Sequence, residues 1–578
     1  MSLFGALSVG ASGLSAAQGG MQVVGNNISN AGTAGYTRQV ANFAPGPDQV
    51  VAGNQSTGSG VTIASIERQV NEALNQNLRD ANSDQNASQT LNSTLTQLQT
   101  TFGALNSNDL SSQLSTFFNG FSTLAQNPTD TSLRTQTIQN GTTIAQYLQG
   151  LRSQVDGVQT NVNSQIQTLT QQANSLLQQV ASLNKQIASS GNTGVNSLDD
   201  QRDQALTQLS QLINVTTVPQ SNGTVNVMLG SIPVVDQTVS RGLSTKQTTD
   251  PTGQFTITQV TYADTGDPTS ISGGQIGGLI NARDNYVQPA ITTIDTVAAG
   301  LINTVNTIHS QGQGLTGFSS VTGTTQVLDT TLPLNASTTQ TGINFPPTNG
   351  TFYLYLTDKV TGQVTPQQIN VNLTGTGTQT SLDDIVNQIN TAGGGVVSAN
   401  DIGGYLTVKS NNSNVTFGFG GDNSGALAAL GVNTFFTGKN ALDIAVNGTL
   451  QGNPQLLATA RYTNPAAPSS GSVDNQANAK TMSSAGNAAS SLLGGQGLSD
   501  YYTNYIGALA IHAQNASNDL SANTTIQSTL SAQQQSVSGV SMDEETVNMM
   551  QYQRAFEGSA KYISTINQMM QDVLNLVQ

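Results

Sequence analysis

The sequence predicts an α+β multidomain protein, in which long, coiled-coil-like helices from both chain ends and a helical stem carry β-rich inserted outer domains. Apolar residues near both termini recur at alternating spacings of three and four, as in the seam of a coiled coil. Residues 216–270 and 321–460 are instead rich in Thr, Val, Gly and Asn, with short alternating runs that favour strands. At 578 residues the chain exceeds what one hydrophobic core can organise, so several structural units are expected.

The N-terminal helix is predicted from a stripe of apolar and small residues. Its members are Leu7, Gly10, Leu14, Ala17, Met21, Val24 and Ile28. The small residues of this stripe would let a partner helix approach closely. We therefore expect residues 1–40 to pair with the C-terminal helix.

The C-terminal helix, expected over residues 541–578, carries the longer stripe. Its members are Met549, Tyr552, Phe556, Ser559, Ile563, Ile566, Met570, Val573 and Val577. At its start, Ser541 and Glu544 have capping-box spacing, and three acidic residues lie where the helix dipole favours negative charge. Burying one stripe against one partner gains less free energy than ordering the segment costs. We therefore expect both ends to be labile in the isolated subunit and helical once neighbours cover more than one face.

The packing members of the two stripes are the predicted assembly interface. They are Leu7, Leu14, Met21, Val24, Ile28, Tyr552, Phe556, Ile563, Ile566, Met570 and Val573.

The interior repeats the helical period and then changes character. Three further stripes run from Leu91 to Leu105, from Val162 to Ile187 and from Val287 to Ile308. Ser381 opens a short helix within the second β-rich stretch, and Gly393 begins the glycine run that closes it. The remaining domain boundaries follow: a helical stem at 41–320 with a β-rich part at 216–270, a variable outer domain at 321–465, and returning stem helices at 466–540.

Composition excludes several classes of function. Only 8% of the residues are charged, and the net charge of −15 repels a phosphate backbone, so nucleic-acid binding is not expected. The absence of cysteine excludes disulfides, thiolate metal sites and cysteine nucleophiles. No apolar run is long enough to cross a membrane. The N-terminus lacks the basic start of a secretory signal, so export would use a route that reads no cleaved signal peptide.

No residue pattern indicates catalysis, a cofactor or a metal. His309 and His512 are the only histidines, and we expect surface or helix-capping roles for both. The G-x-G-x-x-G match that begins at Gly312 follows a predicted helix rather than a strand, which argues against nucleotide binding. Asp199, Asp200 and Asp203 are predicted to form a solvated helix start, because Arg202 lies among them and no cation-binding loop is present.

Both chain ends resemble a known family. The segment SGLSAAQGGMQVVGNNISNAGTAGY (Ser12 to Tyr36) is similar to the N-terminal signature of the axial proteins of the bacterial flagellum, which are the rod, hook and hook-associated proteins. The segment EETVNMMQYQRAFEGSAKYISTINQMMQDVLNL (Glu544 to Leu576) is similar to their C-terminal signature. Inside the chain, SLDDQRDQALTQLSQLINV (Ser197 to Val215) and GGQIGGLINARDNYVQPAI (Gly273 to Ile291) resemble the hook-associated members.

The resemblance implies a non-enzymatic structural adaptor that joins hook to filament. It implies a helical array of identical subunits, with hook protein on one side and a second hook-associated protein on the other. The terminal helices would line the inner tube, and an export chaperone would bind the C-terminal helix. The location implied is the extracellular hook-filament junction.

Two alternatives stay open at this stage. The first is hook protein proper, which shares both end signatures; the long helical region at about 150–215 discriminates, because hook protein is not expected to have it. The second is a secreted adhesin or glycan-binding protein acting through residues 321–440, where Tyr353, Tyr355 and Tyr405 would line a groove.

Overall fold

The computed structural model describes residues 3–52, 55–103, 109–191, 194–468 and 476–576, which divide into two compact units. Unit 1 comprises Met1–Thr94, Val162–Ala282 and Gln514–Gln578, and unit 2 comprises Leu95–Asn161 and Arg283–Ala513. Helices that contribute residues to both units are α2 (Glu72–Thr101), α4 (Thr131–Ser189) and α13 (Leu498–Ser538).

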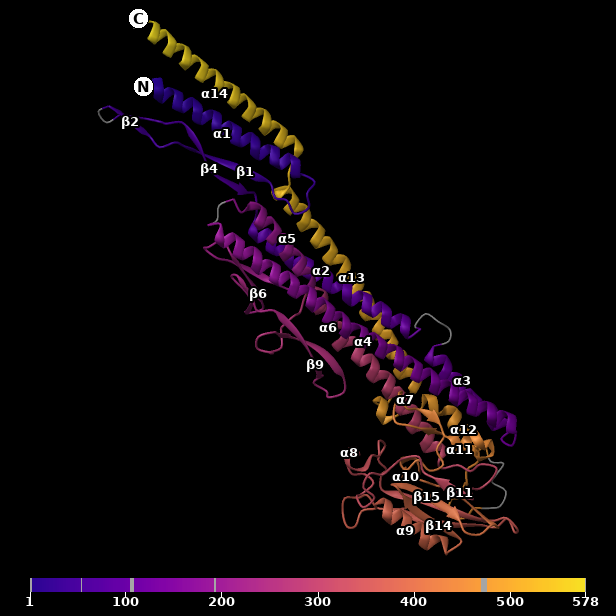
Figure 1. Ribbon diagram of the computed structural model, residues 1–578. Helices are drawn as coiled ribbons and strands as arrows, with labels where there is room; N and C mark the ends of the chain where they lie inside the picture. Colours follow the sequence, from indigo (N-terminus) through magenta and orange to yellow (C-terminus); the bar gives the residue numbers. More distant parts are fainter. Residues whose placement is uncertain (1–2, 53–54, 104–108, 192–193, 469–475, 577–578) are drawn as a thin grey trace. The chain divides into compact units, whose positions relative to one another are not determined.

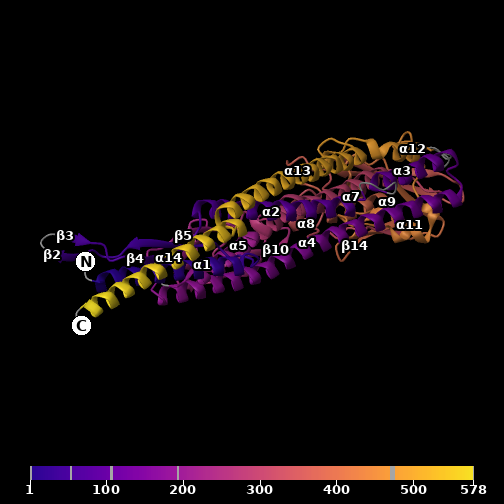
Figure 2. The ribbon, with the colours of Figure 1, turned by 90° about the horizontal axis from the view of Figure 1, so that it is seen from above.

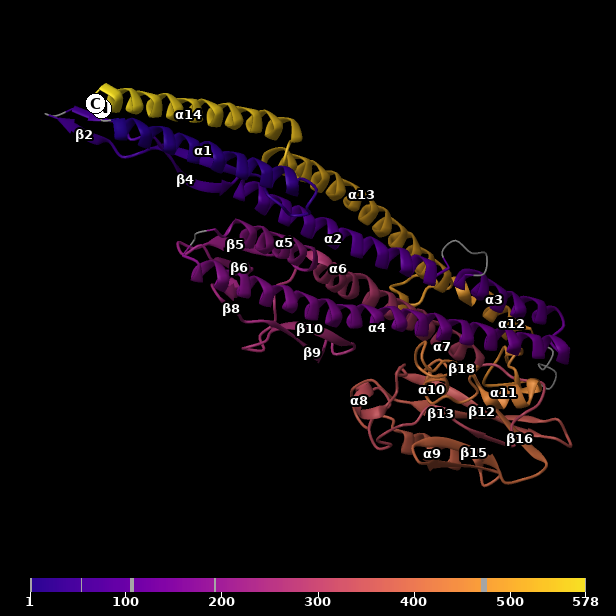
Figure 3. The same cartoon turned by 45° about the horizontal axis from the view of Figure 1, so that its top comes forward.

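The two ends of the chain pair within unit 1. Helix α1 (Leu3–Asn30) lies beside α14 (Met542–Leu576), as Figures 1 and 3 show. The helices are antiparallel, so the first residues of α1 and the last residues of α14 lie at the same end of the pair (Figure 2).

A hairpin covers another side of α1. Strands β1 (Gln39–Pro45) and β4 (Val61–Arg68) pair antiparallel, and β2 (Gln49–Ala52) pairs with β3 (Gln55–Thr57). The main-chain N–H of Val61 donates a hydrogen bond of 3.2 Å to Ser12 Oγ on α1. These strands fall inside the predicted helical stem, so the sequence analysis missed them.

The rest of unit 1 combines helices with small sheets. The helices are α5 (Asn196–Leu212) and α6 (Gly274–Ala282), together with the parts of α2, α4 and α13 named above. One sheet has the strand order β5-β6-β7-β8, and a second pairs β9 with β10. Their bounds are β5 (Thr216–Pro219), β6 (Val225–Leu229), β7 (Ile232–Asp236), β8 (Val239–Ser240), β9 (Leu243–Thr249) and β10 (Thr256–Tyr262). The strands predicted at 216–270 are confirmed.

Unit 2 has a helical part with an aromatic core. Phe117 on α3 (Leu110–Gln126) packs within 5.5 Å, between ring centroids, of Phe121, Phe435 and Phe436. The other helical elements are the π-helix η1 (Arg283–Val287), α7 (Gln288–His309), α8 (Thr338–Thr341), α10 (Ala426–Ala429), α11 (Gly448–Gly452), η2 (Pro454–Leu456), α12 (Ala477–Ser484), η4 (Ala485–Asn487) and η5 (Ser491–Leu493).

Strands of unit 2 form two three-stranded sheets of order β11-β15-β14 and β13-β12-β16, and β17 pairs with β18. Helix α9 (Leu382–Gly393) packs against β13 and β14 (Figure 3). The strands are β11 (Ser320–Thr322), β12 (Gly350–Asp358), β13 (Val364–Val371), β14 (Val397–Ile402), β15 (Tyr405–Ser410), β16 (Val415–Gly420), β17 (Phe436–Thr437) and β18 (Ala445–Val446). Tyr405 lies in a different sheet from Tyr353 and Tyr355, and Tyr355 is buried against Tyr462, so the expected tyrosine groove does not form.

The predicted fold class is confirmed, since long helices from both ends and in the stem accompany β-rich interior parts. The three interior stripes lie on α2, α4 and α7, and their described apolar members are mostly buried. Leu105 and Val577 of the predicted stripes lie outside the described residues.

His309 corrects one expectation. It ends α7 as predicted, but its side chain is fully buried rather than at the surface. Its Nδ1 lies 2.7 Å from the Asn433 carbonyl oxygen, and its Nε2 accepts a hydrogen bond of 3.0 Å from the Ala458 N–H. These partners fix a neutral ring with the proton on Nδ1. Burial, more than the nearby Arg134 cation, lowers the pKa of His309 to about 4. His512 is exposed, with its ring edge against Tyr286.

Candidate assembly interface of the terminal helices

The face of α1 that contacts α14 is lined by glycine. A Cβ added at Gly10 would stand 2.7 Å from Ile563 Cγ1, and one added at Gly20 would stand 2.9 Å from the ring of Tyr552. Distances this short show that α14 side chains rest directly on the α1 backbone. The absence of side chains at these glycines therefore lets the two helices approach closely.

The same contacts define the register of the antiparallel pair. Residue numbers of facing positions add up to 572 or 573 along the whole contact, as in Gly10 with Ile563, Gly13 with Ser559, Gly20 with Tyr552, and Asn27 with Glu545. Tyr552 also packs against Phe43 of β1, with ring centroids 5.8 Å apart.

The predicted seam residues are covered only in part. On α1, Val24 is buried, while Leu7, Leu14, Met21 and Ile28 are half-buried. On α14, Ile566 is buried, whereas Tyr552, Phe556, Ile563 and Met570 are half-buried and Val573 is 48% exposed. The structure thus brings the two stripes into one helix pair without burying them completely.

Both helices keep a free face. Large hydrophobic side chains of α14 stay exposed, namely Met542, Val547, Met550, Tyr562, Met569, Val573 and Leu574. The exposed stripe of α1 contains no charged residue and consists of Phe4, Ser8, Ala11, Ser15, Gln18, Gln22, Asn26 and Ser29. Large hydrophobic side chains left exposed in this number on one helix are typical of a surface that a protein partner covers.

A buried polar centre closes one end of the helix pair. Asn27 is 1% exposed and uses its whole amide: Nδ2 donates to the Gln39 carbonyl oxygen (2.8 Å) and to Glu545 Oε2 (3.0 Å). Its Oδ1 accepts hydrogen bonds from Tyr36 Oη (2.8 Å) and from the Gln39 N–H (3.0 Å). Asn27 therefore joins α1, β1 and the start of α14 in one contact.

Arg38 adds charge to this centre. Its Nε donates to Glu545 Oε1 and its Nη1 to Glu544 Oε2, both at 2.8 Å, and its main-chain N–H donates to the Ser538 carbonyl oxygen at 2.9 Å. Burial, together with the carboxylates of Asp200 and Glu545, raises the pKa of Tyr36 to about 12, so this hydroxyl stays protonated and donates to Asn27. The capping-box prediction is met on one side, by a bond of 3.5 Å from the Glu544 N–H to Ser541 Oγ.

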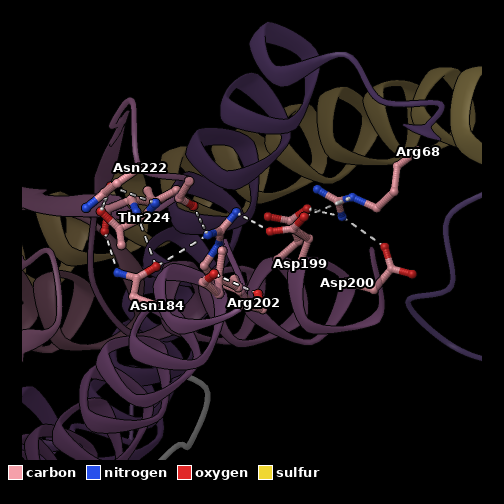
Figure 4. A network of polar contacts seen from close by, with 12 residues as sticks. Arg68, Asn184, Asp199, Asp200, Arg202, Asn222 and Thr224 are labelled. Atoms are coloured by element: carbon pink, nitrogen blue, oxygen red, sulfur yellow. Dashed lines mark hydrogen bonds and ion pairs between the residues drawn. The ribbon is translucent and has the colours of Figure 1, made fainter. Parts of the chain in front are cut away.

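An ion-pair network lies next to this centre (Figure 4). Arg68 at the end of β4 donates to Asp200 Oδ1 (2.9 Å) and Asp203 Oδ2 (2.8 Å) and also faces Asp199. Arg202 pairs with Asp199 at 2.8 Å. The solvated helix start predicted for these aspartates is wrong, because Arg68 comes from a hairpin some 130 residues away and covers them.

The network continues to the first sheet of unit 1 and back to the chain's N-terminal part. Arg202 Nη1 reaches Asn184 Oδ1 (3.3 Å) on α4, and Asn184 Nδ2 bonds the Val225 carbonyl oxygen (2.8 Å) on β6. In the other direction, the Thr37 N–H donates to Asp200 Oδ2 (3.3 Å). Burial is the largest influence on the pKa of Asp199 and raises it. For Arg68, burial acts to lower the pKa, but the surrounding aspartates outweigh it and raise the pKa above its usual value.

The hydrogen bonds and ion pairs of this region join distant segments of the chain to one another. Among the described residues, no group of three or more His, Cys, Asp or Glu is arranged to hold a metal ion. Within the same ranges, every helix is too short or too polar to span a membrane. The Gly312 motif follows α7 and leads into a loop, as predicted, and its glycines pack against neighbouring chain rather than around an open phosphate-sized space.

Comparisons with known proteins match these segments separately. A family model described as the flagellar hook-associated protein FlgK helical domain matches residues 95–324. A model described as flagella basal body rod protein matches residues 7–37, and one for the C-terminal part of flagellar basal body rod FlgEFG protein matches residues 533–576. The two rod-protein matches coincide with α1 and α14, the helices of the candidate interface.

Curated relatives cover the whole chain. Flagellar hook-associated protein 1 of Salmonella typhimurium is 26% identical over 587 aligned positions, which cover 98% of each chain. The protein of the same name from Escherichia coli is 24% identical over 589 positions, again covering 98% of each chain. The chain is thus similar to flagellar hook-associated protein 1 over nearly its whole length. Its resemblance to the flagellar axial proteins, stated from the sequence, is thereby confirmed.

A solved structure shares the fold of this chain. The flagellar hook junction protein FlgK from Burkholderia pseudomallei matches with a TM-score of 0.52 at 18% identity, covering 80% of this chain and 100% of that chain. Sequence reasoning found the helices of the interface but missed the roles of Asn27 and Glu545. Both residues lie inside the family signatures, which were the only sequence signal pointing to them.

Proposed function

We propose that this protein is a structural adaptor that joins the flagellar hook to the filament and is needed for filament assembly. The observation that carries the proposal is the incomplete cover of α14: α1 shields one face, and seven large hydrophobic residues remain exposed. Similarity to flagellar hook-associated protein 1 over nearly the whole chain supplies the setting, and the exposed hydrophobic residues of α14 supply the means of polymerisation.

The finer assignments belong to the same proposal. Identical subunits form a helical array, with hook protein on one side and a second hook-associated protein on the other. The terminal helices line the inner tube of this array. Before assembly, an export chaperone covers the apolar face of α14, and the chain leaves the cell without a cleaved signal peptide. The protein acts outside the cell and catalyses no reaction.

The two alternatives receive less support. The helical-domain match over residues 95–324 includes α4 and α5, the region chosen to distinguish this protein from hook protein proper. For a glycan-binding role of residues 321–440, the expected tyrosine groove is not formed.

Deletion of the gene in the source bacterium tests the adaptor proposal. We expect electron microscopy to show hooks without filaments and immunoblots to show flagellin lost to the medium. Re-expression of the intact chain should restore filaments. Filaments of normal number and attachment in the deletion strain would overturn the proposal.

A further inference from the structure

The contact face of α1 repeats itself along the helix. Gly13 and Gly20 are one heptad apart, and Gly10 and Ala17 have the same separation. A shift of one heptad, about 10 Å along the helix, would place Tyr552 on Gly13 instead of Gly20. Tyr552 and Ser559 would then meet Gly13 and Ala6, which are both small, so packing at these two positions distinguishes poorly between the two registers.

We infer that Asn27 and Glu545 set the register of the α1 and α14 pair. Only the observed register brings the Asn27 amide, 1% exposed, to the Glu545 carboxylate, also 1% exposed. After a heptad shift, Glu545 would face Gly20, which offers no donor. A buried carboxylate without its partners is strongly disfavoured, and a single buried asparagine is known to specify register in helix pairs.

Chain connectivity does not fix the register by itself. The segment 31–38 between α1 and β1 has eight residues, enough to span up to roughly 26 Å when extended. In an array, α1 also meets α14 helices of other copies, to which it has no covalent connection. The consequence for assembly rests on the proposed function, whereas the register itself is a property of the single chain.

Cysteine cross-linking tests the register directly, because the natural chain has no cysteine. A Cβ added at Gly13 would lie 3.7 Å from Ser559 Cβ, close to the separation of about 3.8 Å found in disulfides. The pair G13C/S559C therefore reports the observed register, and A6C/S559C reports the register shifted by one heptad. In a glutathione redox buffer thiol–disulfide exchange is reversible, so each disulfide forms in proportion to the population of its register.

Three backgrounds are compared in the purified full-length chain. The first is the natural sequence, and the second is N27L/E545L, which replaces the polar contact by an apolar one. The third is the matched control N26L/D543L, which changes the exposed neighbours of the same two residues. Intramolecular disulfide is quantified by mass spectrometry.

We expect the observed-register disulfide to exceed the shifted one at least tenfold in the natural and control backgrounds, and the two to approach equality in N27L/E545L. An unchanged ratio in N27L/E545L would overturn the inference. Failure of both cysteine pairs to cross-link in the natural background would overturn it too, since no helix pair would then exist. Filament attachment is scored separately in cells carrying N27L/E545L: a changed disulfide ratio with normal filaments supports the register inference and counts against the interface role of the proposed function.

Discussion

Gly20 lies against the ring of Tyr552, and a Cβ at this position would stand 2.9 Å from two ring carbons. Gly25, on the same helix, has nothing within 4 Å of an added Cβ. We expect Gly20→Val to weaken the helix pair by about 1 to 3 kcal/mol through overpacking, and Gly25→Val to leave it nearly unchanged. Hydrogen exchange of α14 in the two variants measures the difference. Equal exchange in both would mean that α1 and α14 do not touch as described.

Both chain ends should be labile in the isolated subunit. Most seam residues of α14 are only half-buried, so the single partner α1 offsets little of the entropy lost on ordering the helix. Limited proteolysis is expected to trim α1 and α14 first and to leave the buried central part of α4 intact. In assembled hooks, the same sites should resist cleavage. Full protection of both ends in the monomer would contradict this expectation.

A charge within the seam should block assembly. Ile563 contacts α1 at Gly10, whereas Ser564 next to it is exposed. Ile563→Asp places an unpaired carboxylate in the helix contact, while Ser564→Asp adds the same charge at the surface. We expect the first variant to leave hooks bare and the second to support filaments. Circular dichroism should show that the helices of unit 2 persist in both proteins.

Arg68 holds three aspartates together with a side chain that is 8% exposed. Replacement by Ala leaves the carboxylates of Asp200 and Asp203 without this cation, while Asp199 keeps Arg202, and we expect the free energy of unfolding of unit 1 to fall by about 3 kcal/mol. Arg554→Ala, at an exposed position of α14, is the matched control and should change stability little. Urea unfolding, with the loss of helix α5 as the signal, measures the free energy of unfolding of unit 1. Similar stability of the two variants would show that the network contributes little.

Acid should destabilise unit 2 through His309. The unfolded chain binds a proton at this residue near pH 6.5, whereas the folded chain does so only near pH 4. As the pH falls from about 6.5 to about 4, the unfolded chain binds a proton that the folded chain does not. This one group therefore lowers the free energy of unfolding by up to about 3 kcal/mol. His309→Gln keeps a donor and an acceptor but does not titrate, so the difference in pH dependence between this variant and the natural chain isolates the effect. Exposed His512→Gln should behave like the natural chain.

Local patterns predicted the parts of the fold that local interactions determine. The short helix α9 begins at Ser381 with a reciprocal bond to Asp384 and ends at Gly394 in the left-handed conformation, as its sequence indicated. The hairpin of β1 and β4 was missed because its pairing joins residues 16 to 29 positions apart and its burial depends on α1.

The polar contacts of the candidate interface could not be predicted from the sequence for the same reason. Asn27 meets Glu545 across 518 residues, and Arg68 meets Asp200 across 132. Sequence spacing identifies which face of a helix is apolar, but it says nothing of which distant group neutralises a buried amide or carboxylate. The acidic start of α14 was therefore interpreted as a response to the helix dipole, although Glu545 belongs to a buried contact.

Apart from Phe4 at its start, the exposed stripe of α1 up to Ser29 is built from hydroxyls, amides and a small side chain without a single ionic group. In the proposed tube, this stripe would be the wall past which later subunits travel as extended polymers. An uncharged surface of this kind attracts neither acidic nor basic segments of a passing chain, and it exposes little apolar surface to which such segments could adhere. Transit along the bore would then meet low friction whatever the composition of the passing chain.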